Sequence, residues 1–302
     1  MEWKPCLASR LRESAVKSSC ASNTVLLSGL MVCVISGALL YVVKRKRRRN
    51  YVKAAKIIKL IVYPVKSLPG IEVDEAIITK FGLQSGKFRD RMWLLINDEN
   101  RFVTQRTEES LALLRQKFGD KRQKESIVEK KLKIGIKLIQ HMANNKMRPS
   151  SAERNDRVIE LKQYPIAFHD GSAVLVINQN SINDLNAKLP NETKVSYRNF
   201  RPNILITGCD AFAEDYWKYA KIRDIEFTFL KACDRCVFTT INPDTGVKMA
   251  AEPLSTLRTY RLSREEMRKF YGTAPLFGIN LGPESEGVIH CRDIISAVSS
   301  QV

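Results

Sequence analysis

The stretch "AKIIKLIVYPVKSLPGIEVDEAIITKFGLQSG", residues 55–86, indicates the fold class of this chain. Its apolar residues recur at short, mostly two-residue spacings, and Pro64 and the Pro69-Gly70 pair interrupt them. Alternation with a period of two is typical of half-buried strands, and proline and glycine place turns between strands. The stretch therefore predicts several short strands and a β-rich body, and it argues against a helical bundle.

The same texture continues on either side of this stretch. "RDRMWLLINDENRFVTQR", residues 89–106, predicts a hairpin around the turn "NDEN". "AVLVINQNSINDLNAKL", residues 173–189, predicts a buried strand and then a helix capped near Asn180 or Ser181. "IEFTFLKACDRCVFTTIN", residues 225–242, predicts two more strands. No Walker A motif or GxGxxG turn is present, so a nucleotide-binding fold has no support.

The positive charge of the chain is concentrated in two segments. Fifty Lys and Arg residues against 32 Asp and Glu residues give a net charge of +18. Residues 44–56 carry eight basic and no acidic residues, and residues 115–148 carry eleven basic and three acidic residues. The remaining body is close to neutral, which argues against a broad basic face. We therefore predict no nucleic-acid partner.

Residues 24–43, "TVLLSGLMVCVISGALLYVV", contain twenty residues without a charge. A helix of this length spans about 30 Å, the thickness of a bilayer's hydrocarbon core. A cleaved signal peptide is the alternative, but its apolar region is usually shorter and ends in small residues, whereas "KRKRRR" follows here. We predict a tail over 1–23, a transmembrane signal-anchor over 24–43 and a basic linker over 44–56. The more basic downstream flank places the C-terminal body in the cytosol.

Two cysteines three positions apart, Cys233 and Cys236 in "CDRC", allow several chemistries. Structural zinc requires four ligands, and the other Cys and His residues lack ligand spacing. A redox pair would sit at a strand-to-helix junction, whereas "VFTTIN" after the pair is strand-like. Buried inert thiols are the plain alternative. Arg235 beside Cys236 favours a thiolate, which suits a soft metal held mainly by something other than the protein.

A further pattern is a set of basic residues at strand ends and turns, each beside residues that form hydrogen bonds. A solvated surface charge is the plain alternative for any one of them. Arg201 is the hardest to explain in this way, because it abuts the apolar strand "NILITG" and because Pro202 biases it toward an extended backbone. Arginines placed like this bind phosphate through paired hydrogen bonds. The set comprises Lys66, Arg89, Arg91 and Arg201, with Ser67, Asp90, Asn199 and Asn203 beside them.

These motifs together resemble one family. "YPVKS", "GLQSGKFRDRMW", "NFRPNILITGCDAFAED", "CDRCVFTTINPDTG" and "EPLSTLRTYR" are similar to the MOSC-domain molybdenum enzymes. The apolar segment and the basic run after it resemble the membrane-anchored, amidoxime-reducing branch of that family. The resemblance covers residues 24–106 and about 164–290. It implies an α+β, β-rich fold with a MOSC-type β-barrel domain over 164–302 and a MOSC-associated β subdomain over 57–163.

The resemblance also implies a cofactor, Mo-molybdopterin, whose pterin dithiolene carries an anionic phosphate. By motif, Cys236 is the catalytic cysteine and the only protein thiolate on molybdenum, and Cys233 is not a ligand. His169, before "DGS", is expected to be a loop residue and not a base. The contacts to the cofactor are implied for Lys66, Ser67, Arg91, Ser172, Asn199, Arg201 and Arg235.

The activity that the resemblance implies is the reduction of N-hydroxylated compounds, such as amidoximes to amidines. Electrons would come from NADH through NADH-cytochrome b5 reductase and cytochrome b5. The resemblance further implies a monomer at the mitochondrial outer membrane, held in the lipid by its N-terminal helix, with the catalytic domain facing the cytosol.

Three departures from the family pattern keep alternatives open. Residues 107–168 form a shorter span than in the family and contain the second basic segment. Ala173 stands where the family usually has proline, and "GVIHCRDIISAV" departs from the usual ending, so we expect a displaced last strand. One alternative is a cofactor-binding or carrier protein with impaired catalysis. A second is a basic adaptor at the membrane surface.

Overall fold

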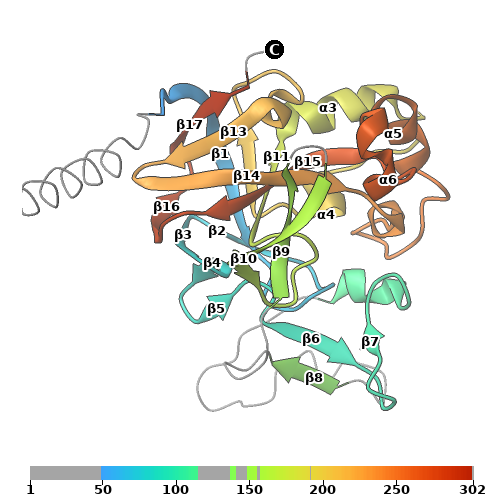
Figure 1. Cartoon of the computed structure of the whole chain (residues 1–302). Helices are drawn as coiled ribbons and strands as arrows, with labels where there is room; N and C mark the ends of the chain where they lie inside the picture. The colour runs from blue at the N-terminus through green and yellow to red at the C-terminus, as the bar shows by residue number, and fades with distance from the viewer. Residues whose placement is uncertain (1–48, 115–136, 141–147, 155–156, 191, 301–302) are drawn as a thin grey trace, which may run out of the picture. The chain divides into compact units, whose positions relative to one another are not determined.

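Figure 1 shows a computed structural model of the 302-residue chain, which describes residues 49–114, 137–140, 148–154, 157–190 and 192–300. The chain divides into two compact units, Met1–Asn50 and Tyr51–Val302. The first lies almost entirely outside the described residues, so the following account concerns the second. Among the described residues, no helix is long and apolar enough to cross a membrane. The anchor predicted over 24–43 lies outside them.

The larger sheet of the body closes on itself as a seven-stranded barrel. Neighbouring strands pair in the order β12, β11, β15, β14, β13, β17 and β1, and β1 pairs again with β12. All of these pairings are antiparallel except that of β11 with β12. The bounds are β1 (Val52–Val62), β11 (Val174–Asn178), β12 (Ile204–Thr207), β13 (Trp217–Ile222), β14 (Ile225–Asp234), β15 (Leu276–Pro283) and β17 (Ile294–Ser299).

Apolar side chains from these strands fill the barrel. Because successive side chains of a strand point to opposite faces, alternate residues line the interior. On β1, Ala55 and Ile57 are buried, whereas Lys56 between them and Ile58 after them are exposed. The same buried cluster takes in Leu60, Val174, Val176, Phe227, Ile279, Leu281 and Ile295.

Smaller sheets lie beside the barrel (Figure 1). β2 (Ile71–Val73) extends the barrel sheet at β1. A four-stranded sheet has the order β16 (Gly287–His290), β3 (Glu75–Thr79), β4 (Gly82–Ser85) and β5 (Phe88–Arg89). A three-stranded sheet contains β7 (Phe102–Val103), β6 (Trp93–Ile96) and β8 (Lys137–Gln140), and β9 (Arg148–Arg154) pairs with β10 (Arg157–Ile166).

Short helices complete the described body. A second apolar cluster joins residues of α3, α4 and α5 to β11 and β15, with Leu185, Phe200, Leu257 and Phe277 fully or almost fully buried. The α-helices are α3 (Gln179–Lys188), α4 (Tyr197–Phe200), α5 (Leu254–Tyr260) and α6 (Arg268–Tyr271). The 3-10 helices are η1 (Glu109–Leu113), η2 (Ala213–Tyr216), η3 (Val237–Thr240) and η4 (Glu265–Met267).

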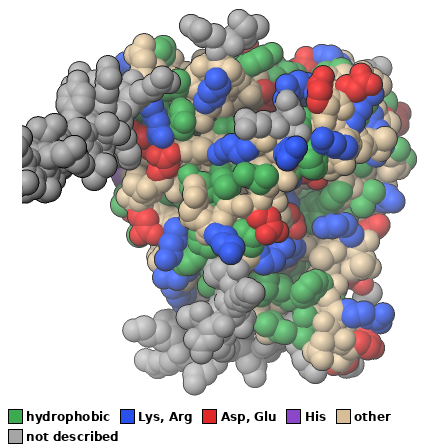
Figure 2. Space-filling model, viewed as in Figure 1, with side chains coloured by type: hydrophobic (Ala, Val, Ile, Leu, Met, Phe, Trp, Pro, Cys, Tyr) green, Lys and Arg blue, Asp and Glu red, His purple; other side chains and the backbone are tan. Residues whose placement is uncertain are grey.

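Several predictions of local structure are confirmed. The body is β-rich, β6 and β7 form the predicted hairpin, and the buried strand β11 leads into α3. The helix cap lies slightly earlier than predicted, at Asn178, whose side chain accepts a hydrogen bond from Asn180 N at 3.0 Å. On the face shown in Figure 2, basic and acidic side chains are interspersed.

Two predictions are wrong. The segment after Cys236 is the 3-10 helix η3 and not a strand, because the threonine hydroxyls there bond back to carbonyls three residues earlier: Thr239 to Cys236 at 3.0 Å and Thr240 to Val237 at 2.7 Å. The last strand is not displaced. β17 pairs with both β1 and β13, and Ile295 is buried in the barrel.

Candidate functional site

One cavity of about 250 Å³ collects the residues that the sequence singled out. They come from five separate segments: the turn after β1, the turn after β5, the segment before β11, the end of α4, and the segment between β14 and η3. The eight predicted site residues in its lining are Lys66, Ser67, Arg91, Ser172, Asn199, Arg201, Arg235 and Cys236. The cavity lining also includes Arg106, His169, Asp170 and Asn280, which the sequence did not single out as site residues.

Three of these residues adopt a left-handed backbone conformation that non-glycine residues rarely take. The φ angles are 67° at Ser67, 50° at Arg91 and 58° at Arg201. Such positions cost roughly 1–3 kcal/mol each and cluster at functional sites. The extended backbone predicted for Arg201 is therefore wrong. Arg201 instead ends α4, and its backbone N–H donates to Tyr197 O at 2.8 Å.

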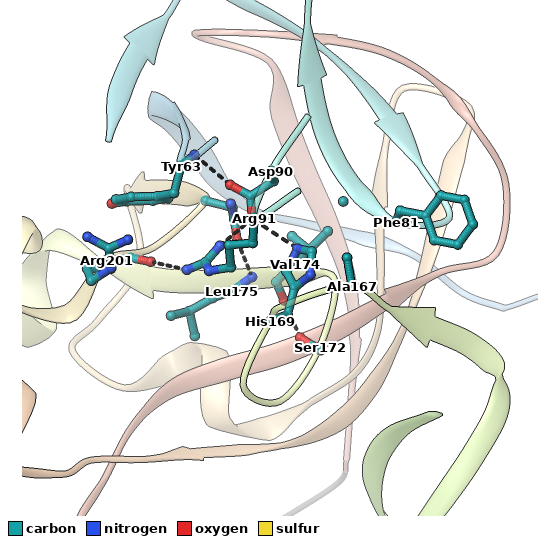
Figure 3. Close-up of polar contacts among 12 residues, drawn as sticks. Tyr63, Phe81, Asp90, Arg91, Ala167, His169, Ser172, Val174, Leu175 and Arg201 are labelled. Atoms are coloured by element: carbon teal, nitrogen blue, oxygen red, sulfur yellow. Dashed lines mark hydrogen bonds and ion pairs between the residues drawn. The ribbon is translucent and has the colours of Figure 1, made fainter. Parts of the chain in front are cut away.

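Two guanidinium groups that line the cavity share one aromatic ring (Figure 3). Arg201 lies 4.2 Å and Arg91 lies 4.9 Å from the ring centroid of Tyr63. Arg201 Nη1 donates to Leu68 O at 2.5 Å, whereas its buried Nη2 has no hydrogen-bond partner among the described residues. Burial lowers the pKa of Arg201 to about 10. A buried cation with an unsatisfied donor is costly, so the site favours an anion.

Asp90 lies behind these two arginines and is fully buried. Its Oδ1 accepts the backbone N–H of Tyr63 at 2.6 Å, and its Oδ2 pairs with Arg91 Nη1. Burial alone would raise the pKa of Asp90, but the Arg91 guanidinium, the His169 imidazole and the Tyr63 N–H outweigh burial and lower that pKa to about 2. Asp90 therefore stays ionised and holds Arg91 at the cavity wall. The position of Asp90 between Arg89 and Arg91 was the only signal for it in the sequence.

Lys66, in the turn after β1, also lines the cavity. Its Nζ lies 2.6 Å from Asp170 Oδ1. Asp170 is exposed, and the charge and hydrogen bond of Lys66 lower its pKa. The cavity is therefore lined by several basic side chains and by a carboxylate that remains ionised.

The two cysteines of "CDRC" occupy different environments. Cys236 is exposed and begins η3, so its thiol is accessible from the cavity that it lines. Cys233 also lines this cavity, but it is only partly exposed and packs against the apolar cluster around α3, α4 and α5, and burial raises its pKa. Both thiols are free. Among the described residues, no group of three or more His, Cys, Asp and Glu side chains could hold a metal ion.

Arg235 has a different geometry from the one that its place in the sequence suggested. Its guanidinium is buried and donates from Nε to Phe277 O at 2.8 Å and from Nη1 to Phe200 O at 3.0 Å. It also lies 5.4 Å from the ring centroid of Phe200. Because its guanidinium is bonded to these backbone carbonyls, Arg235 connects β15 to the end of α4 beside Cys236.

Asn199 and Ser172 are likewise bonded to the chain itself. Asn199 Oδ1 accepts Ser196 N at 3.0 Å, and its Nδ2 donates to Thr239 O at 3.2 Å and to Ile241 O at 3.3 Å. Ser172 Oγ lies 2.9 Å from Val174 O and 2.8 Å from Asn280 Oδ1. Asn199 therefore joins α4 to the segment that carries Cys236, and Ser172 joins its own loop to β15.

A larger cavity of about 630 Å³ adjoins the first and shares Asn199, Arg201 and Phe238 with it. Neither cysteine of the pair lines it. Several of its charged side chains pair with one another or with neighbours: Glu72 with Tyr197 and Lys59, and Arg198 with Asp244. The smaller cavity, with its accessible thiol and clustered cations, is therefore the better candidate for chemistry.

Comparison with known proteins gives this geometry a context. A family model described as the MOSC domain matches residues 163–296, and one described as the MOSC N-terminal beta barrel domain matches residues 54–162. Mitochondrial amidoxime-reducing component 1 of Homo sapiens is 37% identical over 286 residues, which cover 82% of this chain and 84% of that protein.

Two further relatives give the same picture. The Mus musculus protein of that name is 34% identical, and mitochondrial amidoxime reducing component 2 of Homo sapiens is 33% identical. The matches cover 82% of this chain and, respectively, 84% and 85% of those proteins. Because 82% of 302 residues is about 248, roughly 38 of the 286 positions aligned with the first human protein have no counterpart here. The chain belongs to the MOSC-domain family of mitochondrial amidoxime-reducing components.

Proposed function

We propose that this chain is a molybdenum-cofactor-dependent oxidoreductase that reduces N-hydroxylated compounds such as amidoximes to amidines. The observation that carries the proposal is the cavity that the exposed Cys236 lines together with Lys66, Arg91 and Arg201. A soft thiolate and a set of cations suit a soft metal carried on an anionic organic group. The names of the curated relatives support the reaction class.

The residues present fit molybdopterin on two grounds. Arg201 has a buried nitrogen without a partner beside a second arginine, which suits a phosphate. Cys236 presents one accessible thiol, which suits a metal that takes its other sulfur ligands from the pterin. We propose that Cys236 ligates molybdenum and that Lys66, Ser67, Arg91 and Arg201 hold the pterin and its phosphate. Ser172, Asn199 and Arg235 then support them by fixing the loop, the α4 end and β15.

The proposed reaction balances as a two-electron reduction. An amidoxime, two electrons and two protons give an amidine and water, so the N–O bond breaks and its oxygen leaves as water. The bound cofactor would supply a single centre able to exchange both electrons. The chain's own contribution would be to orient that group, to provide one thiolate and to neutralise the anionic pterin with cations.

The electron donors and the cellular site are also part of the proposal. NADH would deliver electrons through NADH-cytochrome b5 reductase and cytochrome b5 to a monomer at the mitochondrial outer membrane, with its body facing the cytosol. The names of the relatives and the uncharged residues 24–43 support this arrangement. Anchoring enzyme and donor to one membrane would raise the effective concentration of each for the other.

The test is a matched pair of cysteine variants in the full chain, Cys236→Ala and Cys233→Ala. Molybdenum by mass spectrometry, pterin by fluorescence after oxidation and benzamidoxime turnover are measured for each. We expect metal and turnover in the wild type and in Cys233→Ala, and loss of turnover with reduced metal in Cys236→Ala. A wild type without molybdenum, or a Cys236→Ala variant as active as the wild type, would refute the proposal.

A second candidate function is a cofactor-binding or carrier protein with impaired catalysis. The roughly 38 aligned positions that this chain lacks relative to the human protein favour it. The same experiment separates the two functions. Full loading with molybdenum and pterin but no turnover, under conditions in which a relative turns over, would support the carrier.

A further inference from the structure

A buried histidine in the lining of the cavity takes no part in the proposed chemistry. His169 is 1% exposed, and its Nε2 lies 3.0 Å from Asp90 Oδ2 (Figure 3). The other carboxylate oxygen of Asp90 accepts Tyr63 N, and Oδ2 is shared with Arg91 Nη1. One fully buried carboxylate thus connects a turn that follows β1, a cavity arginine and an imidazole that precedes β11.

The environment of His169 determines its tautomer. Neither of its buried ring nitrogens has a partner in hydrogen-bond geometry among the described residues, and Nε2 lies 3.0 Å from Asp90 Oδ2. A protonated ring would leave an unsatisfied N–H at Nδ1, which is costly in a buried site. Burial also lowers the pKa of His169 against the opposing effect of Asp90. The imidazole is therefore neutral, and the 3.0 Å approach of Nε2 to Asp90 Oδ2 favours the tautomer with its proton on Nε2.

The neighbouring strand leaves room for this ring. Gly82 begins β4 with φ +107°, and a Cβ added there would lie 3.1 Å from His169 Nε2 and 2.7 Å from Ala173 O. A side chain at position 82 would displace the ring or the backbone behind it. The backbone at Ala173, Gly82 and the His169 ring are therefore packed closely against one another.

The residues around His169 connect it to the cavity. Phe168 N donates to Arg91 O at 3.2 Å, and Arg148 donates to the carbonyl oxygen of His169. The next residue, Asp170, pairs with Lys66, and Ser172 also lines the cavity. His169 is therefore the buried anchor of a loop, residues 168–172, that lines the candidate site.

We propose that His169 is a positioning residue for the cofactor site. Its Nε2–H occupies one side of Asp90 Oδ2, so that Asp90 holds Arg91 in the orientation that receives an anionic group and the 168–172 loop stays against the cavity. Without this donor, a buried carboxylate oxygen would have only Arg91, which would then be drawn from the cavity toward Asp90. This inference rests on the proposed molybdenum cofactor and assigns His169 a role that the sequence motifs did not suggest.

The test compares His169→Gln with His169→Met in the full chain. Glutamine and methionine have similar length and volume, but only glutamine can place an N–H near the position of Nε2. Supporting residues around a metal site typically change affinity by about 10–100-fold. We expect His169→Met to lose pterin and molybdenum by about tenfold relative to wild type after equal dilution and gel filtration. His169→Gln should retain most of both.

A direct measurement covers the case in which His169→Met fails to fold. The chain has three histidines, so 15N imidazole spectra of the wild type can be assigned by substitution. We expect the neutral Nε2–H tautomer for His169 in loaded and unloaded protein. An imidazolium, the Nδ1–H tautomer, or equal cofactor retention in folded Gln and Met variants would overturn the inference. A wild type without molybdenum would instead overturn the proposed function.

Discussion

At the scale of single residues, Arg201 shows how tertiary contacts override a local preference. A residue before proline favours an extended backbone, yet Arg201 has φ 58° and ends α4. The contacts that hold it there are the Tyr63 ring at 4.2 Å and Leu68 O at 2.5 Å, both from the N-terminal part of the body. The motif identified the residue in the sequence, but its conformation depends on partners that only the fold brings near.

Glu214 gives a residue-scale prediction about pH. It is fully buried beside β11 and α3; Asn178 N and Ser181 Oγ donate to its Oε1 at 3.2 Å each, and its Oε2 has no partner among the described residues. Burial, with the neighbouring charge of Asp215, raises its pKa from 4.5 to about 7. The folded state therefore keeps a proton that the unfolded state loses between pH 4.5 and 7.

A carboxyl group whose pKa is higher in the folded state than in the unfolded state stabilises the fold most at pH values below its unfolded pKa. Its contribution to the free energy of unfolding therefore declines as the pH rises through the range between these two pKa values. We expect the free energy of unfolding of the wild type, minus that of Glu214→Gln, to fall by roughly 3 kcal/mol from pH 4.5 to 8. Urea titrations of both proteins at several pH values measure this difference. His169 and the other titrating groups are common to both proteins and cancel. A difference that does not change with pH would contradict the assignment.

At the scale of elements, α4 and η3 behave as one unit that presents Cys236. Asn199 provides the connection, because its oxygen caps α4 at Ser196 and its amide reaches the Thr239 and Ile241 carbonyls. Thr239 N and Thr239 Oγ1 in turn donate to Cys236 O at 3.1 and 3.0 Å. The backbone that carries the accessible thiol is thus held by a continuous set of hydrogen bonds.

Asn199→Asp tests this unit with a change of a single group. The cap at Ser196 would remain, but an oxygen would replace the nitrogen that faces two carbonyls in a buried place. We expect a loss of about 3 kcal/mol or more in the free energy of unfolding. Faster amide hydrogen exchange over residues 237–241 should accompany it. Asn183→Asp, the same change on the exposed face of α3, should alter stability by about 0.5 kcal/mol or less. Equal effects of the two substitutions would contradict the proposed connection.

The elements also show where reading the sequence succeeds. The alternation on β1, the hairpin of β6 and β7 and the strand-to-helix step from β11 to α3 follow from local patterns, and all three are present. η3 was missed because its threonines favour a strand locally, whereas their hydroxyls bond back to earlier carbonyls. His169 and Asp90 were not singled out as partners because they are 79 positions apart and only the fold pairs them.

At the scale of the whole body, the two family matches do not correspond to two separable sheets. β1 lies in the first match, yet it closes the barrel between β12 and β17 of the second. β16 lies in the second match, yet it pairs with β3 of the first. Each matched range therefore contributes one strand to a sheet that includes strands of the other range. The cavity also draws its lining from both, with Lys66 and Arg91 from the first part and Arg201 and Cys236 from the second.

This exchange predicts that residues 51–162 and 163–302 will not fold when made separately. Without β1, the C-terminal fragment loses Ile57, Leu60 and Val62 from its buried interior and leaves β12 and β17 unpaired along one edge. Burial of three such side chains contributes roughly 5–9 kcal/mol. That is comparable with the entire net stability of about 5–15 kcal/mol of a typical domain. Circular dichroism and NMR should show no cooperative unfolding for either fragment, and mixing them should restore it. The intact 51–302 body is the control. Cooperative unfolding of 163–302 alone would show that the barrel does not depend on β1.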